Sequence, residues 1–175
     1  PSRKYNSTNW FYGSKFTELV LGDNVTTIGD YAFYKCNTIT NVHIPKSVTT
    51  IGADALDSCS KLTSVTIPES VTSIGYSAFA NCSSLKVIKI PDSVTNLGYY
   101  AFSGCYNLSR VEIGKNITTE GYNAFSECSG IEELVIKTEY VPTDAFLSST
   151  KIKRIYFSKD IIAVYNNAFK NCYDI

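Results

Sequence analysis

The chain has 175 residues, and its 16 lysine and arginine side chains are balanced by 16 aspartate and glutamate side chains. A protein without net charge has no overall field that attracts nucleic acid or an anionic membrane surface, so we expect neither partner. Since no run of about 18 apolar residues occurs, no segment is predicted to insert into a membrane. The chain begins Pro-Ser-Arg, which indicates a mature or excised piece of a longer protein.

A unit of 23 residues repeats along the chain and predicts its organisation. Residues 1–15 are interpreted as a degenerate half-repeat that covers the first unit, with Trp10 in the place that phenylalanine takes later. Residues 16–175 contain seven repeats of 21–23 residues and the start of an eighth; the repeats begin at Phe16, Ile39, Leu62, Leu85, Leu108, Ile131, Ile152 and Ile175. A fixed period of this length predicts a solenoid, in which no repeat buries its apolar face alone.

The clearest copy, from Leu62 to Ser84, shows what each repeat is expected to form. Val65 and Ile67 alternate with polar residues, as one face of a strand does, and a proline ends the strand. Gly75 is expected to provide a tight turn with an unusual backbone angle. Residues 78–82 place Ala, Phe and Cys at the spacing of a short helical turn that faces the core. Because strands that recur in one direction form a parallel sheet, we predict an α/β repeat solenoid. The sheet is expected on the concave face, and short helical or 3₁₀ segments on the convex side.

Six cysteines occupy the same place in their repeats: Cys36, Cys59, Cys82, Cys105, Cys128 and Cys172. Equivalent side chains of a solenoid point the same way, whereas a disulfide needs Cβ atoms that face each other. His43 is the only histidine and no Cys-x-x-Cys pair occurs, so a zinc site lacks ligands. We therefore expect buried free thiols rather than disulfides or a metal. The sequence also lacks a nucleophile elbow, a phosphate-binding loop and a carboxylate pair at a defined spacing, so we expect no enzyme activity and no cofactor.

The outward-facing residues of the predicted strands form two rows on the concave face. In the later repeats these rows contain Val87, Lys89, Arg110, Glu112, Glu133, Val135, Arg154 and Tyr156. Stacking makes each residue the lateral neighbour of the equivalent residue in the next repeat. Along one row the charges of Arg110, Glu133 and Arg154 therefore alternate in sign, and in the other row Lys89 meets Glu112. One interpretation is a protein-binding patch, and the other is cross-strand pairing that only stabilises the sheet. The two are compatible, because paired side chains remain able to contact a ligand.

Two later repeats depart from the pattern. Glu120 takes an inward place that isoleucine or leucine fills in earlier repeats. A carboxylate buried there would have a raised pKa and would mark a site, whereas a shift of the local turn would let it reach water. Repeat six is two residues short and contains Pro142, so we expect a kink or bulge within residues 139–144.

The repeated phrase L-x-x-V-x-I-P-x-S-V-T-x-I-G-x-x-A-F-x-x-C resembles the BspA-type, or Treponema pallidum-type, leucine-rich repeat, from Phe16 to Ile175. The resemblance implies a right-handed leucine-rich-repeat horseshoe. It also implies an extracellular or cell-surface module that binds proteins, such as an adhesin for a host extracellular-matrix or plasma glycoprotein. The alternative is a structural spacer that presents another domain and has no ligand of its own. A further expectation is end-to-end contact between copies through the open C-terminal repeat.

Overall fold

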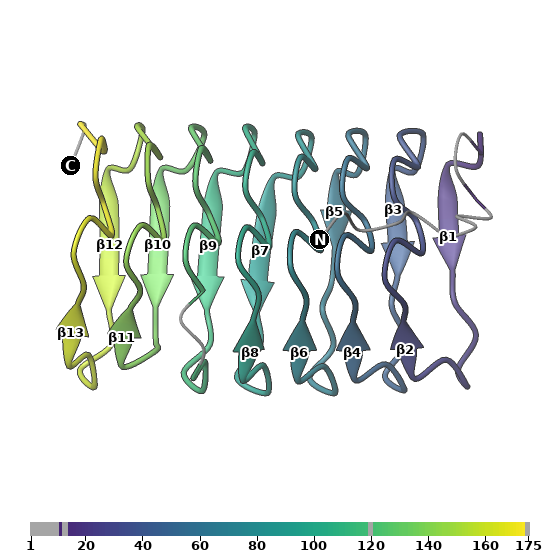
Figure 1. Cartoon of the computed structure of the whole chain (residues 1–175), viewed down its shortest axis with the longest axis horizontal. Helices are drawn as coiled ribbons and strands as arrows, with labels where there is room; N and C mark the ends of the chain where they lie inside the picture. Colours follow the sequence, from purple (N-terminus) through teal and green to yellow (C-terminus); the bar gives the residue numbers. More distant parts are fainter. Residues whose placement is uncertain (1–10, 12–13, 119–120, 174–175) are drawn as a thin grey trace, which may run out of the picture.

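The computed structural model describes Phe11, residues 14–118 and residues 121–173, and this part winds into turns that stack side by side along one axis (Figure 1). Most turns carry a longer strand and a two-residue strand, followed by a segment of consecutive tight turns. Trp10, Glu120 and Ile175 lie outside the described residues, as does most of the predicted N-terminal half-repeat. The division of the chain at residue 15 therefore stays a prediction.

The first strand of each repeat belongs to the predicted parallel sheet, which is divided into two separate parts. The first part contains β1 (Glu18–Val20), β3 (Asn41–His43) and β5 (Ser64–Val65). The second contains β7 (Val87–Ile90), β9 (Arg110–Ile113), β10 (Glu133–Ile136) and β12 (Arg154–Phe157). Equivalent residues of successive repeats are in register within each part, as the 23-residue period predicts. No strand pairing within the described residues joins β5 to β7.

A second, smaller parallel ladder runs along the lower part of Figure 1. Its strands are β2 (Thr27–Ile28), β4 (Thr50–Ile51), β6 (Ser73–Ile74), β8 (Asn96–Leu97), β11 (Tyr140–Val141) and β13 (Ala163–Val164). β2, β4, β6 and β8 pair in that order and β11 pairs with β13. The equivalent place in the repeat between β8 and β11 is residues 119–120, which lie outside the described residues. The kink or bulge expected within residues 139–144 stays a prediction, and β11, which lies in this range, pairs regularly with β13.

The predicted helical or 3₁₀ segments are wrong, because the described residues contain no helix. In the third repeat Ser77 and Asn81 have positive φ angles of 49° and 57°, and left-handed residues interrupt a right-handed helix. The backbone N–H groups of Ser77, Phe79 and Asn81 donate to carbonyls of the next turn, over 2.8–3.0 Å. The N–H groups between them donate to carbonyls three residues back. A helix directs its N–H groups along its own axis and could not bond to a neighbouring turn in this way. The protein is therefore an all-β solenoid, with a ladder of tight turns where helices were expected.

In the second, third and fourth repeats this glycine serves close packing rather than an unusual backbone angle, which corrects the prediction for Gly75. Among the described glycines, only Gly104 has a positive φ. A Cβ atom added to Gly75 would lie 2.6 Å from the backbone nitrogen of Ala53 in the preceding turn. Successive turns therefore approach each other so closely at this place that a side chain does not fit.

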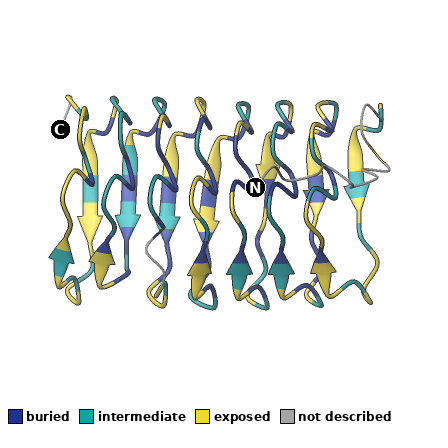
Figure 2. Ribbon diagram, viewed as in Figure 1, coloured by how far each residue is buried: buried dark blue, intermediate teal, exposed yellow. Residues whose placement is uncertain are grey.

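The inward side chains stack in ladders along the solenoid, and buried and exposed residues alternate along the strands (Figure 2). Phe79, Phe102, Phe125 and Phe146 are buried, and successive ring centroids are 5.1–5.4 Å apart. This distance is close to the roughly 4.7–4.9 Å spacing of paired strands, so each ring lies flat on the equivalent ring of the next turn. The predicted inward face of the repeat is confirmed.

The cysteines form a second ladder and no disulfide, as predicted. The Cys59 thiol donates to the Phe33 carbonyl of the preceding turn at 3.3 Å, and Cys82 donates in the same way to Leu56. Burial raises the pKa of Cys59 to about 12 and that of Cys82 well above its ordinary value. A thiolate in this ladder would be both desolvated and next to a carbonyl oxygen, so these thiols are inert side chains of the core.

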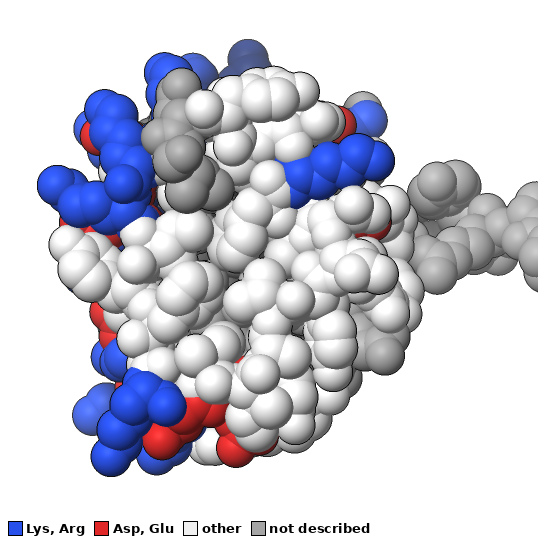
Figure 3. Space-filling view, turned by 90° about the vertical axis from the view of Figure 1, so that its left-hand side faces the viewer, with Lys and Arg blue, Asp and Glu red and all other residues white. Residues whose placement is uncertain are grey.

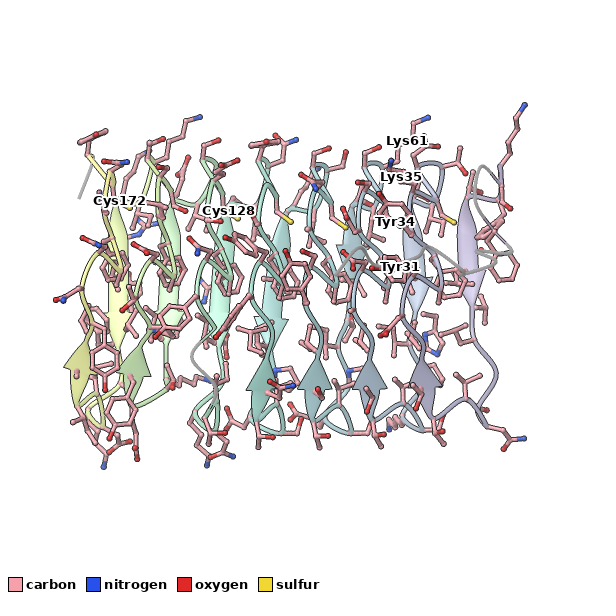
Figure 4. The ribbon with its side chains drawn as sticks, in the orientation of Figure 1. Tyr31, Tyr34, Lys35, Lys61, Cys128 and Cys172 are labelled. Carbon is pink, nitrogen blue, oxygen red and sulfur yellow. The ribbon has the colours of Figure 1, made fainter. Side chains whose placement is uncertain are left out.

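We expect a small alkylating reagent such as iodoacetamide to modify Cys172 first in the native protein. Cys172 is only half-buried, whereas Cys128 and the equivalent residues of the inner turns are fully buried (Figure 4). The inner thiols should react only after unfolding, because the thiolate is the nucleophile and burial disfavours it. Mass spectrometry after a timed pulse measures the number of labels, and a Cys172→Ser variant should lose the fast fraction. Fast labelling of Cys82 or Cys105 in that variant would contradict the buried ladder.

Candidate protein-binding face

All eight predicted binding residues lie on one sheet, formed by β7, β9, β10 and β12. We call this surface the β7–β12 patch; it consists of Val87, Lys89, Arg110, Glu112, Glu133, Val135, Arg154 and Tyr156. Side chains alternate along a strand, so the neighbours of the patch residues, such as Ile88, Val111 and Leu134, are buried. The strand register brings the eight residues together in two rows of four.

Glu133 lies between two arginines, as the repeat period predicts. Its carboxylate pairs with the Arg110 guanidinium on one side and lies 3.1 Å from Nη2 of Arg154 on the other. The Glu133 side chain keeps 16 % of its surface exposed, against 48 % for Arg110 and 61 % for Arg154. A guanidinium has five N–H donors, more than a shared carboxylate can accept. The row therefore presents two positioned cations, with the carboxylate shielded between them.

Lys89 and Glu112 are lateral neighbours, as predicted, but the ion pairs of the described residues join each of them to another partner. The Glu112 carboxylate accepts a hydrogen bond of 2.6 Å from Nζ of Lys137. Nζ of Lys89 instead lies 3.9 Å from Glu69. The hydrogen bond to Glu112 raises the pKa of the Lys137 ammonium. Sequence analysis missed Lys137 because it follows the strand at a place where proline or glycine stands in the earlier repeats.

Apolar side chains interrupt the charged rows. Val87 and Tyr156 are 51 % and 52 % exposed, and Val135 is half-buried between Glu112 and Tyr156. In the view of the C-terminal end, Lys and Arg side chains gather at the left-hand rim, whereas the centre is uncharged (Figure 3). The predicted contact between copies through this end stays a prediction. Positioned cations next to exposed apolar groups form a surface suited to binding a protein.

In the described ranges, no group of three or more His, Cys, Asp or Glu side chains could hold a metal ion. No helix of the described residues is long and apolar enough to cross a membrane. An aromatic cluster lies in the tight-turn segment of the first repeat, where Tyr31 and Tyr34 meet edge to face at 5.9 Å (Figure 4). Nζ of Lys35 lies 5.0 Å from the Tyr34 ring centroid, which accounts for the cluster as a cation–π contact.

Comparison with solved structures shows which proteins have this fold. A leucine-rich-repeat protein from T. pallidum is 25 % identical over 93 % of this chain and 79 % of its own, with a TM-score of 0.84. The pneumococcal vaccine antigen PcpA is 20 % identical over 87 % of this chain, which spans 42 % of PcpA, with a TM-score of 0.71. A leucine-rich-repeat protein from Eubacterium ventriosum is 20 % identical over 93 % of this chain and 60 % of its own, with a TM-score of 0.60. No curated protein matches the chain.

The family model described as "BspA type Leucine rich repeat region" matches residues 4–68 and 50–175, in six copies. These ranges include all of the strands described above. The match confirms the resemblance carried by the repeated phrase. The chain belongs to the BspA-type leucine-rich repeat family.

Proposed function

We propose that the β7–β12 patch binds a protein ligand and that the chain acts as an extracellular or cell-surface adhesion module. The observation that carries the proposal is the Arg110–Glu133–Arg154 row with exposed Val87 and Tyr156 beside it. Leucine-rich-repeat proteins commonly mediate protein interactions, and family membership supports this class of function. The proposed ligand is a host extracellular-matrix or plasma glycoprotein.

The patch would act by preorganisation rather than by chemistry. The ion pairs to Glu133 restrain the two arginine side chains before a ligand arrives, which reduces the entropy lost on binding. Acidic groups on the ligand would accept the remaining guanidinium N–H groups, and Arg is strongly suited to such charge-assisted hydrogen bonds. Tyr156 would supply apolar area at low entropic cost, since its side chain has few rotatable bonds.

The competing function is a structural spacer with no ligand of its own. A spacer needs a rigid stack but no particular outward residues. The outward residues of the β7–β12 patch differ from turn to turn, whereas the inward places of the same strands are uniformly aliphatic except at Phe157. This contrast favours a binding surface over a spacer.

We expect the Arg110→Ala/Tyr156→Ala double variant to lose at least about tenfold in affinity for the glycoprotein it binds, because both residues are of types that dominate binding energy. Surface plasmon resonance against immobilised extracellular-matrix and plasma glycoproteins measures the dissociation constants. The matched control is Lys35→Ala/Tyr106→Ala, which removes an exposed cation and an exposed tyrosine from the tight-turn segments. Circular dichroism should show the same folded state for both variants.

The possible results separate the two functions. Binding that the control retains and the double variant loses supports the proposal. Binding that survives in the double variant shows that the β7–β12 patch is not the site. Absence of saturable binding to every glycoprotein in the panel would overturn the adhesion function and favour the spacer.

A further inference from the structure

The row of side chains just before the long strands changes at Lys86. Thr40, Thr63 and Ser109 stand at the equivalent place in other repeats. Each of their hydroxyls donates over 3.0 Å to the carbonyl of the equivalent residue one turn earlier. Since a lysine has no hydroxyl, the Thr63 carbonyl receives no such bond from Lys86. The row of hydroxyls bonded to carbonyls is therefore broken between the third and fourth repeats.

The backbones of the two turns also lie further apart at this place. The backbone nitrogen of Lys86 is 3.4 Å from the Thr63 carbonyl oxygen, whereas the equivalent distances in the other described turns are 2.7–3.0 Å. The parallel sheet is divided here as well, between β5 and β7, and all the residues from one strand to the other are described (Figure 1). The small ladder continues without a break from β6 to β8. The third and fourth turns therefore separate at the start of the long strands and stay paired in the small ladder.

A groove of about 430 Å³ lies where the two turns separate. We call it the Lys86 groove; it is lined by Thr63, Ser84, Lys86, Asn107 and Ser109. Its size falls within the roughly 300–1,000 Å³ range of small-molecule sites, most of which have apolar walls. No aromatic or acidic side chain and no residue of the β7–β12 patch lines the groove. Its walls are polar throughout, so it is suited to a polar ligand.

Lys86 gives the groove a positive charge. Its side chain is exposed and takes part in none of the ion pairs of the described residues. Lysines of neighbouring turns differ in this respect, since Lys89, Lys137 and Lys153 each have a carboxylate oxygen within 3.9 Å. An ammonium is a compact charge with three N–H donors, and it binds oxyanions well. The Lys86 ammonium is therefore available to an anionic group of a ligand.

The other four side chains fit the hydroxyl groups of a sugar. The hydroxyl protons of Thr63 and Ser109 are donated to carbonyls, which leaves their oxygens as acceptors. Nδ2 of Asn107 donates to the Ser83 carbonyl at 2.7 Å, which positions an amide that still has a second N–H and an acceptor oxygen. Ser84 is half-buried and adds a hydroxyl that can donate or accept. Donors and acceptors thus lie around a single cation, as a ligand with one negative charge and several hydroxyls requires.

We propose that the Lys86 groove binds an acidic sugar, with the negative group of the sugar on the Lys86 ammonium and its hydroxyls on the other four side chains. The negative group has two possible sources, the carboxylate of a sugar acid or the sulfate ester of a sulfated sugar. Both are oxyanions that accept charge-assisted hydrogen bonds. This proposal goes beyond the proposed function, because it does not depend on protein contacts made by the β7–β12 patch.

The test titrates the whole chain with glucuronate, glucose 6-sulfate and glucose, followed by ¹H–¹⁵N NMR. We expect one or both acids to bind saturably and at least about tenfold more tightly than glucose, because a hydrogen bond to a charged group contributes more than a neutral one. The acid that binds more tightly identifies carboxylate or sulfate as the source. Lys86→Gln keeps a long polar side chain without the charge and should lose about tenfold in affinity for that acid. Since Lys86 is exposed, the fold should be maintained.

Lys46→Gln is the matched control, because Lys46 is an exposed lysine that follows β3 and does not line the groove. It should leave the affinity unchanged, and so should the Arg110→Ala/Tyr156→Ala variant of the patch. Ser84→Ala should weaken the binding of the acidic sugar but not that of acetate, which has no hydroxyl groups. The proposal is overturned if neither acid saturates the groove or if acetate binds as tightly as glucuronate. Equal losses in Lys86→Gln and Lys46→Gln would also overturn it.

Discussion

The Phe102→Ala variant should lose about 3–5 kcal/mol of unfolding free energy, the usual cost of truncating a buried aromatic side chain. Phe102 is fully buried and lies between Phe79 and Phe125, with ring centroids 5.1 Å and 5.2 Å away. A solenoid turn contacts only its two neighbours, so a void at Phe102 weakens both interfaces of the central turn. A loss of this size is a large part of the total stability of most domains.

Urea denaturation followed by circular dichroism measures this loss. Phe102→Leu is the matched control, because Leu56 already occupies the equivalent place in the second repeat, fully buried. The leucine variant keeps most of the apolar volume and should lose clearly less than the alanine variant. Equal losses in the two variants would show that stacking and filled volume at Phe102 do not stabilise the solenoid.

The second large effect is expected from adding a single methyl group to Gly98. In Gly98→Ala the new Cβ would lie 2.5 Å from the backbone nitrogen of Tyr76 and would also meet the backbone of Gly75. Backbone atoms of a paired turn cannot rotate away as a side chain can, so the two turns must separate. We expect a loss of about 1–3 kcal/mol or more, the range for overpacking a filled site.

Gly29→Ala is the control, since it makes the same change at the same place in the first repeat. A Cβ atom on Gly29 would meet nothing within 4 Å, and its φ is not positive. Alanine there should be neutral or should stabilise by up to about 1 kcal/mol, because it restricts the unfolded chain. Thermal melts of the two variants should therefore shift in opposite directions or differ clearly in size. Similar shifts would rule out close approach between turns as the reason for the glycine.

Much of the fold follows from the 23-residue period. A repeat of constant length places equivalent residues of parallel strands opposite each other, so the period predicts the sheet, its register and the inward rows. The same argument places Glu133 between Arg110 and Arg154, since they are equivalents in successive turns. It also predicts that the cysteines are parallel neighbours rather than disulfide partners. These features need only the spacing of residues along the chain.

The tight-turn segments could not be predicted in this way. Ala78, Phe79 and Cys82 have the spacing of a helical turn, but Ser77 and Asn81 adopt left-handed φ angles that non-glycine residues rarely take. With these angles the backbone N–H groups of Ser77, Phe79 and Asn81 donate hydrogen bonds to carbonyls of the next turn. That benefit depends on a neighbour 22 residues away and leaves no local signal in the sequence.

The departures from the 23-residue period show the same limit of prediction from the sequence. Repeat six is shorter, so Lys137 and Thr138 stand at places of the turn where earlier repeats have other residues. As a result Lys137, rather than Lys89, contacts Glu112. A repeating pattern specifies contacts between equivalent residues, and the stacked structure is needed to specify contacts between residues that are not equivalent. The binding proposal for the β7–β12 patch rests on contacts of the first kind, and the Lys137–Glu112 pair is a contact of the second.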